Sequence, residues 1–231
     1  MTKLKLLGKH FYNIGLNITC ISNQLTEHNF YDSSILKAPY HKWKHLKSER
    51  QKEDELDNFE WNEATGIGTV AGYNNLHILD IDGCSNDNFI DDILVILGLP
   101  KHYEWVVKTG SQDGYHIYFY SNIFGVLEDN QVCSTFPANE ENIGLFEKME
   151  LLWSTHVVLP NSLHKSGDKY KFVNSSYPTK KPNQIDINRF NVILDLFLNR
   201  TKIIKKKNYF NTWTEEIELN QPSNIEKIDL S

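Results

Sequence analysis

The segment Leu76-His-Ile-Leu-Asp-Ile-Asp82 constrains the fold more than any other part of the chain. Its apolar residues fall on both sides of an extended backbone, which is typical of a strand buried in the middle of a sheet. Because side chains alternate along a strand, Asp80 and Asp82 share one face, whereas Leu79 and Ile81 point to the other. Two neighbouring carboxylates repel each other unless a cation neutralises them. The segment therefore predicts a central strand that carries a candidate cation site.

Around this strand the sequence predicts a mixture of helices and strands. Ser85 is a suitable N-cap for a helix from about Asn86 to Leu97, which Gly98 and Pro100 end. Further strands are expected at Ile18–Ile21, Trp105–Thr109, Tyr115–Tyr120, Met149–Trp153 and His156–Leu159. The last two of these strands are expected to pair with each other.

Elsewhere the expectations are helices and loops. Helical spacing is clear from Ile187 to Leu198, and a shorter helix is expected from Leu4 to Tyr12. The stretch from Trp43 to Asn62 is highly charged and compatible with a helix on the surface. A long loop that contains Pro137 is expected between the strand at Tyr115–Tyr120 and the last strand pair.

Composition places the chain among ordinary globular proteins. Its 231 residues are 40% hydrophobic and 23% charged, which fits one large domain or a domain with a small satellite. No apolar run approaches the roughly 18 to 20 residues that cross a bilayer, so no membrane partner is expected. The three cysteines show no CxxC spacing, which argues against a disulfide framework or a zinc knuckle and favours an intracellular setting, in the cytoplasm or an organelle.

The charge balance narrows the classes of function. A net charge of -6 argues against a protein that coats nucleic acid through bulk charge. It leaves open an enzyme that holds nucleic acid with one local patch, such as the lysines between Lys37 and Lys52, and binds metal with carboxylates. A solvated surface remains an equal interpretation of that lysine-rich stretch.

Two more polar residues fall within apolar strand patterns. Glu150 lies inside Met149-Glu-Leu-Leu-Trp153, where a charge is costly to bury unless it is paired or bound to metal. His116 lies near the start of its strand, on the same face as Tyr118. All four residues have a structural alternative. The aspartates can lie at a strand end that faces water, Glu150 can lie on an edge strand with one face exposed to solvent, and His116 can be a hydrogen-bonded structural histidine. Together the three carboxylates favour a hard divalent ion such as Mg²⁺ or Mn²⁺.

With these motifs the chain resembles the Prim-Pol group of the archaeo-eukaryotic primase superfamily, the bifunctional DNA primase/polymerase domains. The resemblance runs from about Phe11 to Phe172, and its order and spacing are more specific than any single element. The elements are Lys37-Ala-Pro39 with Trp43, Gly66-Ile-Gly68, Asp80-Ile-Asp82, Lys108-Thr-Gly-Ser111, Gly114-Tyr-His116-Ile-Tyr-Phe119, Glu150, Val157-Val-Leu-Pro-Asn-Ser-Leu-His164, Ser166-Gly167 and Tyr170. Glu150 stands where aspartate is more usual, Gly114 stands where serine is often found, and the cysteine cluster of some relatives is absent.

The resemblance implies an α+β fold: an RRM-like palm of mostly antiparallel sheet with flanking helices, plus an N-terminal αβ unit. We expect a catalytic domain over residues 1–200, with the N-terminal unit at about 1–65 and the palm at about 66–200. Residues 201–231 are expected to form a flexible charged tail.

The resemblance also implies roles for individual residues. Asp80, Asp82 and Glu150 would bind two divalent ions, Mg²⁺ or Mn²⁺, and His116 would contact the phosphates of the incoming nucleotide. The nucleotide pocket would include the remaining matched polar residues, Lys37, Ser111, Ser162 and His164.

The implied activity is template-directed nucleotidyl transfer in DNA replication. The substrates would be an NTP or dNTP and a single-stranded DNA template or primer, and a separate replicative helicase would be a partner. Two other classes stay open: a catalytically inactive replication protein that binds nucleic acid, and a metal-dependent nuclease.

Overall fold

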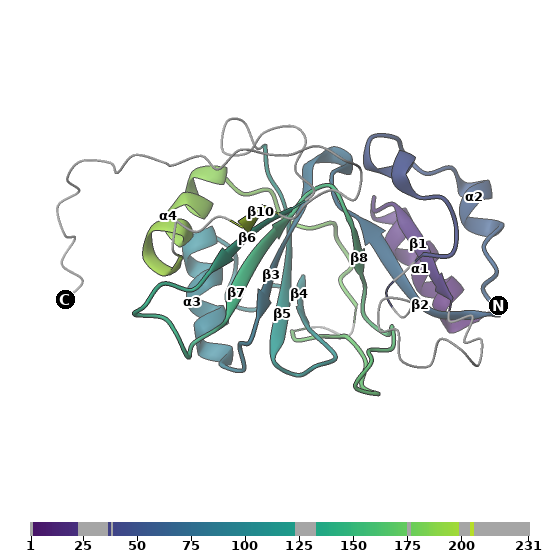
Figure 1. The fold of residues 1–231 in the computed structure, drawn as a ribbon. Coiled ribbons are helices and arrows are strands. Elements are labelled where there is room, and N and C mark those ends of the chain that lie inside the picture. The colour runs from purple at the N-terminus through teal and green to yellow at the C-terminus, as the bar shows by residue number, and fades with distance from the viewer. Residues whose placement is uncertain are drawn as a thin grey trace.

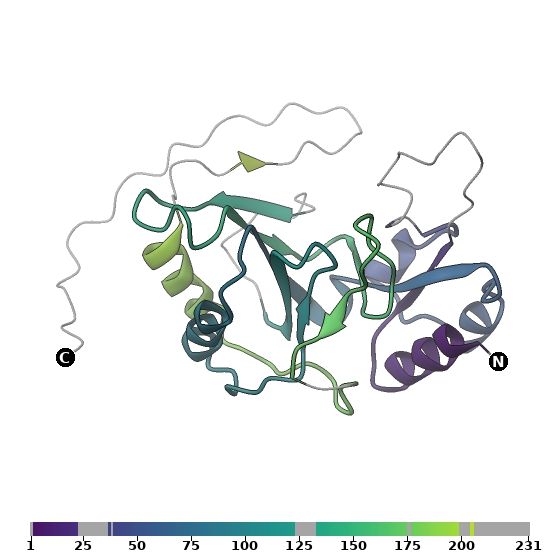
Figure 2. The same ribbon diagram turned by 90° about the horizontal axis from the view of Figure 1, so that it is seen from below.

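The structure of the chain, a computed structural model, describes residues 2–22, 37, 39–122, 133–174, 177–198 and 204–205. A seven-stranded sheet forms its centre, and a three-stranded sheet lies beside it. Helices α3 and α4 cover one side of the larger sheet, and the N-terminal elements lie on the other side (Figures 1 and 2). All pairings between named strands are antiparallel. This arrangement confirms the α+β class expected from the sequence.

The acidic strand lies at the centre of the larger sheet. In spatial order this sheet contains β10 (Ile204–Lys205), β6 (Cys133–Pro137), β7 (Lys148–Leu152), β3 (Leu76–Asp82), β5 (Gly114–Tyr120), β4 (Val106–Lys108) and β9 (Lys171–Phe172). Strand β3 has β7 on one side and β5 on the other, so both of its edges are paired. Leu79 and Ile81 are fully buried, as the apolar pattern of this segment predicts.

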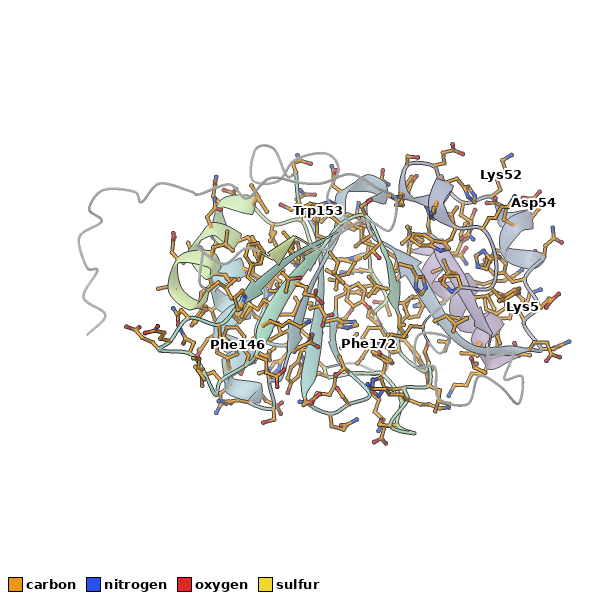
Figure 3. All side chains as sticks on the ribbon, in the orientation of Figure 1. Lys5, Lys52, Asp54, Phe146, Trp153 and Phe172 are labelled. Atoms are coloured by element: carbon orange, nitrogen blue, oxygen red, sulfur yellow. The ribbon has the colours of Figure 1, made fainter. Side chains whose placement is uncertain are left out.

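Helix α3 (Asp87–Leu97) follows β3 and packs against helix α4 (Ile187–Phe197). The predicted buried stripe of α3 is confirmed; it consists of Phe89, Ile90, Ile93, Leu94 and Leu97. The N-cap is Asn86 rather than the expected Ser85, because the Asn86 side chain accepts a hydrogen bond from the backbone N–H of Asn88. Phe146 stacks on Phe89 beside these helices, where Figure 3 labels it.

The smaller sheet corrects one expected strand pairing. It consists of β1 (Ile18–Ser22), β2 (Ala64–Val70) and β8 (His156–Val158), with β2 in the middle. The sequence predicts that the strands at 149–153 and 156–159 pair with each other, but β8 pairs with β2 instead. The physical reason is that β7 has no free edge, because β3 and β6 occupy both of its sides.

A further expectation about secondary structure is wrong, and another is made more specific. Strand β6 lies where a loop was expected; Pro137 is tolerated because it is the last residue of that strand. The stretch from Trp43 to Asn62, which the sequence marks as compatible with a helix, contains two short helices, η2 (Lys44–Lys47) and α2 (Glu53–Asp57). The chain also contains helix α1 (Lys3–Asn13) and the short helix η3 (Tyr73–Asn75).

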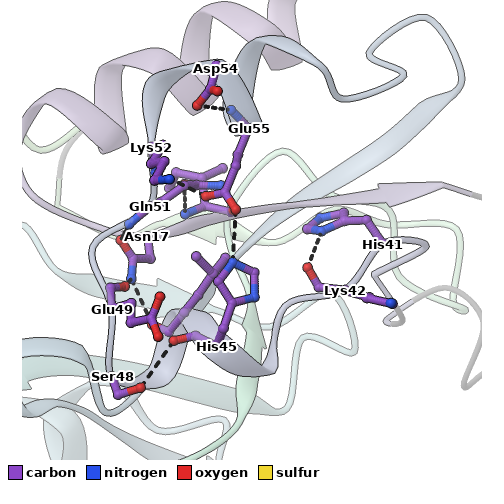
Figure 4. Close-up of polar contacts among 12 residues, drawn as sticks. Asn17, His41, Lys42, His45, Ser48, Glu49, Gln51, Lys52, Asp54 and Glu55 are labelled. Atoms are coloured by element: carbon purple, nitrogen blue, oxygen red, sulfur yellow. Dashed lines mark hydrogen bonds and ion pairs between the residues drawn. The ribbon is translucent and has the colours of Figure 1, made fainter.

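Side chains hold the backbone between η2 and α2 in a non-helical path. The buried Asn17 side chain donates to Leu46 O at 2.7 Å and accepts from the backbone N–H of Gln51 at 2.9 Å (Figure 4). The Gln51 side chain in turn donates to Ile18 O on β1 at 2.8 Å. These bonds to backbone groups compete with helix formation and dock the charged segment on the smaller sheet. Lys5, Lys52 and Asp54 lie at the end of the molecule farthest from α3 and α4 (Figure 3).

The predicted division near residue 65 remains a prediction, although β2 begins at Ala64 and joins β1 and β8 in one sheet. The expected flexible tail falls outside the described residues except for β10, which pairs with β6. Over the part of the chain that is described, no helix has the length and apolarity needed to cross a bilayer.

Candidate functional site

The candidate site is a row of polar residues that runs across four neighbouring strands of the larger sheet. Asp80 on β3 is paired with Glu150 on β7 and with His116 on β5, and Glu150 is paired with Thr135 on β6. Residues directly opposite each other on neighbouring strands have their side chains on the same face. The Tyr118 hydroxyl, which is also on this face, donates to Val158 O of β8 at 3.0 Å. The row is therefore on the face of the larger sheet that is turned toward the smaller sheet.

Three carboxylates meet in this row. One oxygen from each of Asp80, Asp82 and Glu150 lies within 4.8 Å of the others. Two oxygens that bind the same Mg²⁺ or Mn²⁺ ion are roughly 3 to 4 Å apart, since each lies about 2.1 Å from the ion. The sequence predicts that carboxylates from separate segments converge, and the structure brings these three together. Only a small shift of the side chains is needed for their oxygens to bind one ion.

The environment of Asp80 supports a cation here. Its side chain is 17% exposed, and its buried Oδ1 has no hydrogen-bond partner. The Nε2 atom of His116 lies 3.4 Å from this oxygen, but the two atoms do not form a hydrogen bond. Burial, followed by the charges of Asp82 and Glu150, raises the pKa of Asp80 well above its usual range. A buried carboxylate oxygen without a donor is costly, and an all-oxygen donor set fits Mg²⁺ or Mn²⁺.

Two residues at the site were not predicted from the sequence. Lys148 contacts Asp82 Oδ2 through its Nζ, which also lies 3.0 Å from Glu150 Oε2. Thr135 Oγ1 donates to Glu150 Oε1 at 2.7 Å. Lys148 has a signal in the sequence, because it precedes Glu150 by two residues and so shares its strand face. Thr135 has none, because its strand was expected to be a loop.

Burial lowers the pKa of Lys148, but its hydrogen bonds to Asp82 and Glu150 outweigh that effect, so the net pKa is raised. The ammonium group is therefore charged at neutral pH. It places one positive charge among three carboxylates.

His116 is neutral in this arrangement. Burial, reinforced by the positive charge of Lys37, lowers the pKa of His116 to about 4. Its Nδ1 lies 3.4 Å from the Tyr118 hydroxyl oxygen, whose proton is donated to Val158 O. That oxygen can therefore accept a hydrogen bond from an Nδ1–H. In this neutral tautomer Nε2, which faces Asp80, carries no proton. The ring of Tyr170 lies beside the imidazole, with a centroid distance of 5.7 Å.

The predicted nucleotide-binding residues lie in different environments. Lys37 is exposed, and its positive charge offsets a small part of the rise in the pKa of Asp80 that burial causes, so the two groups lie near each other. Ser111 is exposed in the turn between β4 and β5, and its hydroxyl lies 2.8 Å from Thr109 Oγ1. His164 packs against Tyr170, and burial lowers its pKa.

Ser162 differs from these residues. It has no exposed surface, and its hydroxyl is bonded at 2.9 Å to both the N–H and the C=O of Ile67. Its geometry favours an indirect role, in which it anchors the segment before His164 to β2. The nucleotide-binding roles of Lys37, Ser111, Ser162 and His164 stay predictions.

Comparison with known proteins identifies the family of this chain. A search of curated proteins found no match. The sequence model of the family described as "Bifunctional DNA primase/polymerase, N-terminal" (Prim-Pol) matches residues 25–185. That range covers well over half of the chain and includes Asp80, Asp82, His116 and Glu150. The chain therefore belongs to the Prim-Pol family of bifunctional DNA primase/polymerase domains, a family of nucleotidyltransferases.

Proposed function

We propose that the protein is a template-directed nucleotidyltransferase that starts or extends DNA chains during replication. Asp80, Asp82 and Glu150 hold two divalent ions in this proposal. The observation that carries it is the convergence of these three carboxylates beside His116, in a chain of the Prim-Pol family. The substrates are an NTP or dNTP and a single-stranded DNA template with its primer, and a separate replicative helicase is the proposed partner.

When bound, Mg²⁺ or Mn²⁺ lowers the pKa of a primer 3′-hydroxyl and offsets the charge that develops on the phosphoryl oxygens. The three carboxylates are suited to different parts of this task. Asp80 and Glu150 are largely buried, with 17% and 7% of their side chains exposed, and Thr135 orients Glu150. Asp82 is 40% exposed at the end of β3, so its carboxylate is accessible from solvent.

His116 acts on the nucleotide in this proposal. Its Nδ1–H is held on the Tyr118 hydroxyl, so a neutral ring offers only an acceptor at Nε2. The negative charge of a triphosphate favours the imidazolium form, which has a second N–H at Nε2 that can donate to a phosphate oxygen. The positive charge of Lys37 acts on both Asp80 and His164, so these groups lie near one another. Lys37 and His164 would contribute further hydrogen-bond donors to the nucleotide.

The test is an incorporation assay with the purified chain. It uses a primed and an unprimed single-stranded DNA template, dNTPs or NTPs, and Mg²⁺ or Mn²⁺. Wild-type protein should incorporate nucleotides, and Asp80→Asn should lower the rate about a thousandfold or more, because it removes a charge that holds the ions. The matched control is Asp92→Asn, on an exposed position of α3.

A folding control accompanies this assay. Asp80→Asn relieves repulsion among the three carboxylates, so its melting temperature without metal should not fall below that of the wild type. Full activity in Asp80→Asn would refute the proposal. Strand cleavage without incorporation would identify a nuclease instead. An absence of incorporation, cleavage and Mn²⁺ binding, with DNA binding retained, would identify an inactive replication protein.

A further inference from the structure

The ammonium group of Lys148 lies between two of the three carboxylates that form the candidate metal site. Its Nζ contacts Asp82 Oδ2 and lies 3.0 Å from Glu150 Oε2. The strand register sets this position, because Lys148 on β7 is paired directly with Asp82 on β3. Lys148 also precedes Glu150 by two residues on the same face of the sheet. The pairing of β7 with β3 therefore determines this contact.

The two carboxylates differ in how much they need this partner. Glu150 is 7% exposed, and a charge buried to this extent is strongly destabilising unless it is paired. Thr135 donates to its Oε1, and Lys148 donates to its Oε2, so both oxygens have a donor. Asp80 contrasts with this, since its buried Oδ1 has no donor at all. Without metal, Lys148 thus bonds to Asp82 and Glu150, whereas Asp80 Oδ1 has no hydrogen-bond donor.

A divalent ion that binds Asp82 and Glu150 competes with Lys148 for the same oxygens. Two cations within a few ångströms of each other also repel, so the ammonium group and the ion disfavour each other. Lys148 has a route out of the site: its side chain is 36% exposed and ends a flexible four-carbon chain. Glu150 lacks such freedom because it is buried and bonded to Thr135.

We propose that Lys148 is a built-in counter-ion that holds Asp82 and Glu150 together in the metal-free protein and is displaced from them by divalent ions. It thereby sets the affinity of the site for those ions. The nature of the displacing ions rests on the proposed function, whereas the ion pair itself is independent of it. Lys148 is a positioning residue in this scheme.

The first experiment is calorimetric titration of the full chain with Mn²⁺ alone. Lys148→Met removes the competing charge and keeps the length of the side chain. Its dissociation constant for Mn²⁺ should be about tenfold lower than that of the wild type, given the strength of hydrogen bonds between charged groups. Lys148→Gln, which keeps a hydrogen-bond donor without the charge, should shift the constant in the same direction. Lys171→Met, at an exposed position on the edge strand β9, is the matched control and should leave the constant unchanged.

The second experiment measures thermal unfolding in the presence of EDTA. Lys148→Met should melt at a lower temperature than wild-type protein, because Asp82 and Glu150 then repel each other without compensation. Added Mn²⁺ should raise the melting temperature of Lys148→Met by more than it raises that of the wild type. If Lys148→Met does not fold in EDTA, the same comparison with Lys148→Gln replaces it.

The outcomes separate this inference from the proposed function. If only the Lys148 variants bind Mn²⁺, the inference stands and the metal-dependent function of the native chain fails. If wild type and variants bind equally, if the variants bind more weakly, or if none binds, the inference is overturned. Nucleotide incorporation by wild-type protein, measured alongside, decides the proposed function independently of these affinities.

Discussion

Thr135 offers a sharp test of how the site holds Glu150. It lies on β6, is 5% exposed, and donates its hydroxyl to Glu150 Oε1 at 2.7 Å. Thr135→Val preserves the shape of the side chain and deletes this single donor. The buried carboxylate then keeps Lys148 on its other oxygen but loses the bond that fixes its orientation.

The expected magnitude follows from the charge of the acceptor. A hydrogen bond to a charged group contributes about 1.5–3 kcal/mol, so the free energy of unfolding of the metal-free protein should fall by about 2 kcal/mol. Removal of a residue that orients a metal ligand costs about 10- to 100-fold in metal affinity. The dissociation constant for Mn²⁺ should therefore rise at least about tenfold.

Urea denaturation and calorimetric titration with Mn²⁺ measure the two effects. The control is Thr19→Val on β1, because Thr19 is fully buried but its Oγ1 has no hydrogen-bond partner. That variant should keep or slightly raise the stability of the protein. Thr135→Ser retains the hydroxyl and should restore the metal affinity. Wild-type affinity in Thr135→Val, or an equal loss of stability in Thr19→Val, would refute this account.

Two further predictions concern stability away from the carboxylates. Burial lowers the pKa of His77 to about 4, so the unfolded chain binds a proton near pH 6.5 while the folded protein resists it. This residue should cost the protein up to about 1.4 kcal/mol per pH unit as the pH falls from 6.5 toward 4. In urea denaturation at several pH values, His77→Gln should weaken the dependence of the free energy of unfolding on pH, and the exposed control His102→Gln should not. An equal slope in wild type and His77→Gln would contradict this role of His77. Gly68→Ala should lower the free energy of unfolding by about 1–3 kcal/mol, because the new Cβ would lie 2.0 Å from His156 Nε2; wild-type stability would show that this contact relaxes freely.

The sequence by itself determined the local elements and much of the chemistry. The alternation along Leu76–Asp82 placed Asp80 and Asp82 on one face, and helical spacing identified the buried stripe of α3. These inferences succeed because the periods of strands and helices depend only on backbone geometry. The order of short motifs was also sufficient to identify the family, which the match over residues 25–185 confirms.

Tertiary structure alone decided which strands are neighbours and which side chains complete the site. The partner of β8 depends on which sheet edges are free, and Thr135 reaches Glu150 only because β6 pairs with β7. Lys148 and Asp82 are 66 positions apart in the chain, and the register of β7 against β3 brings them into contact. Strand pairing depends on the packing of the whole sheet rather than on local sequence patterns.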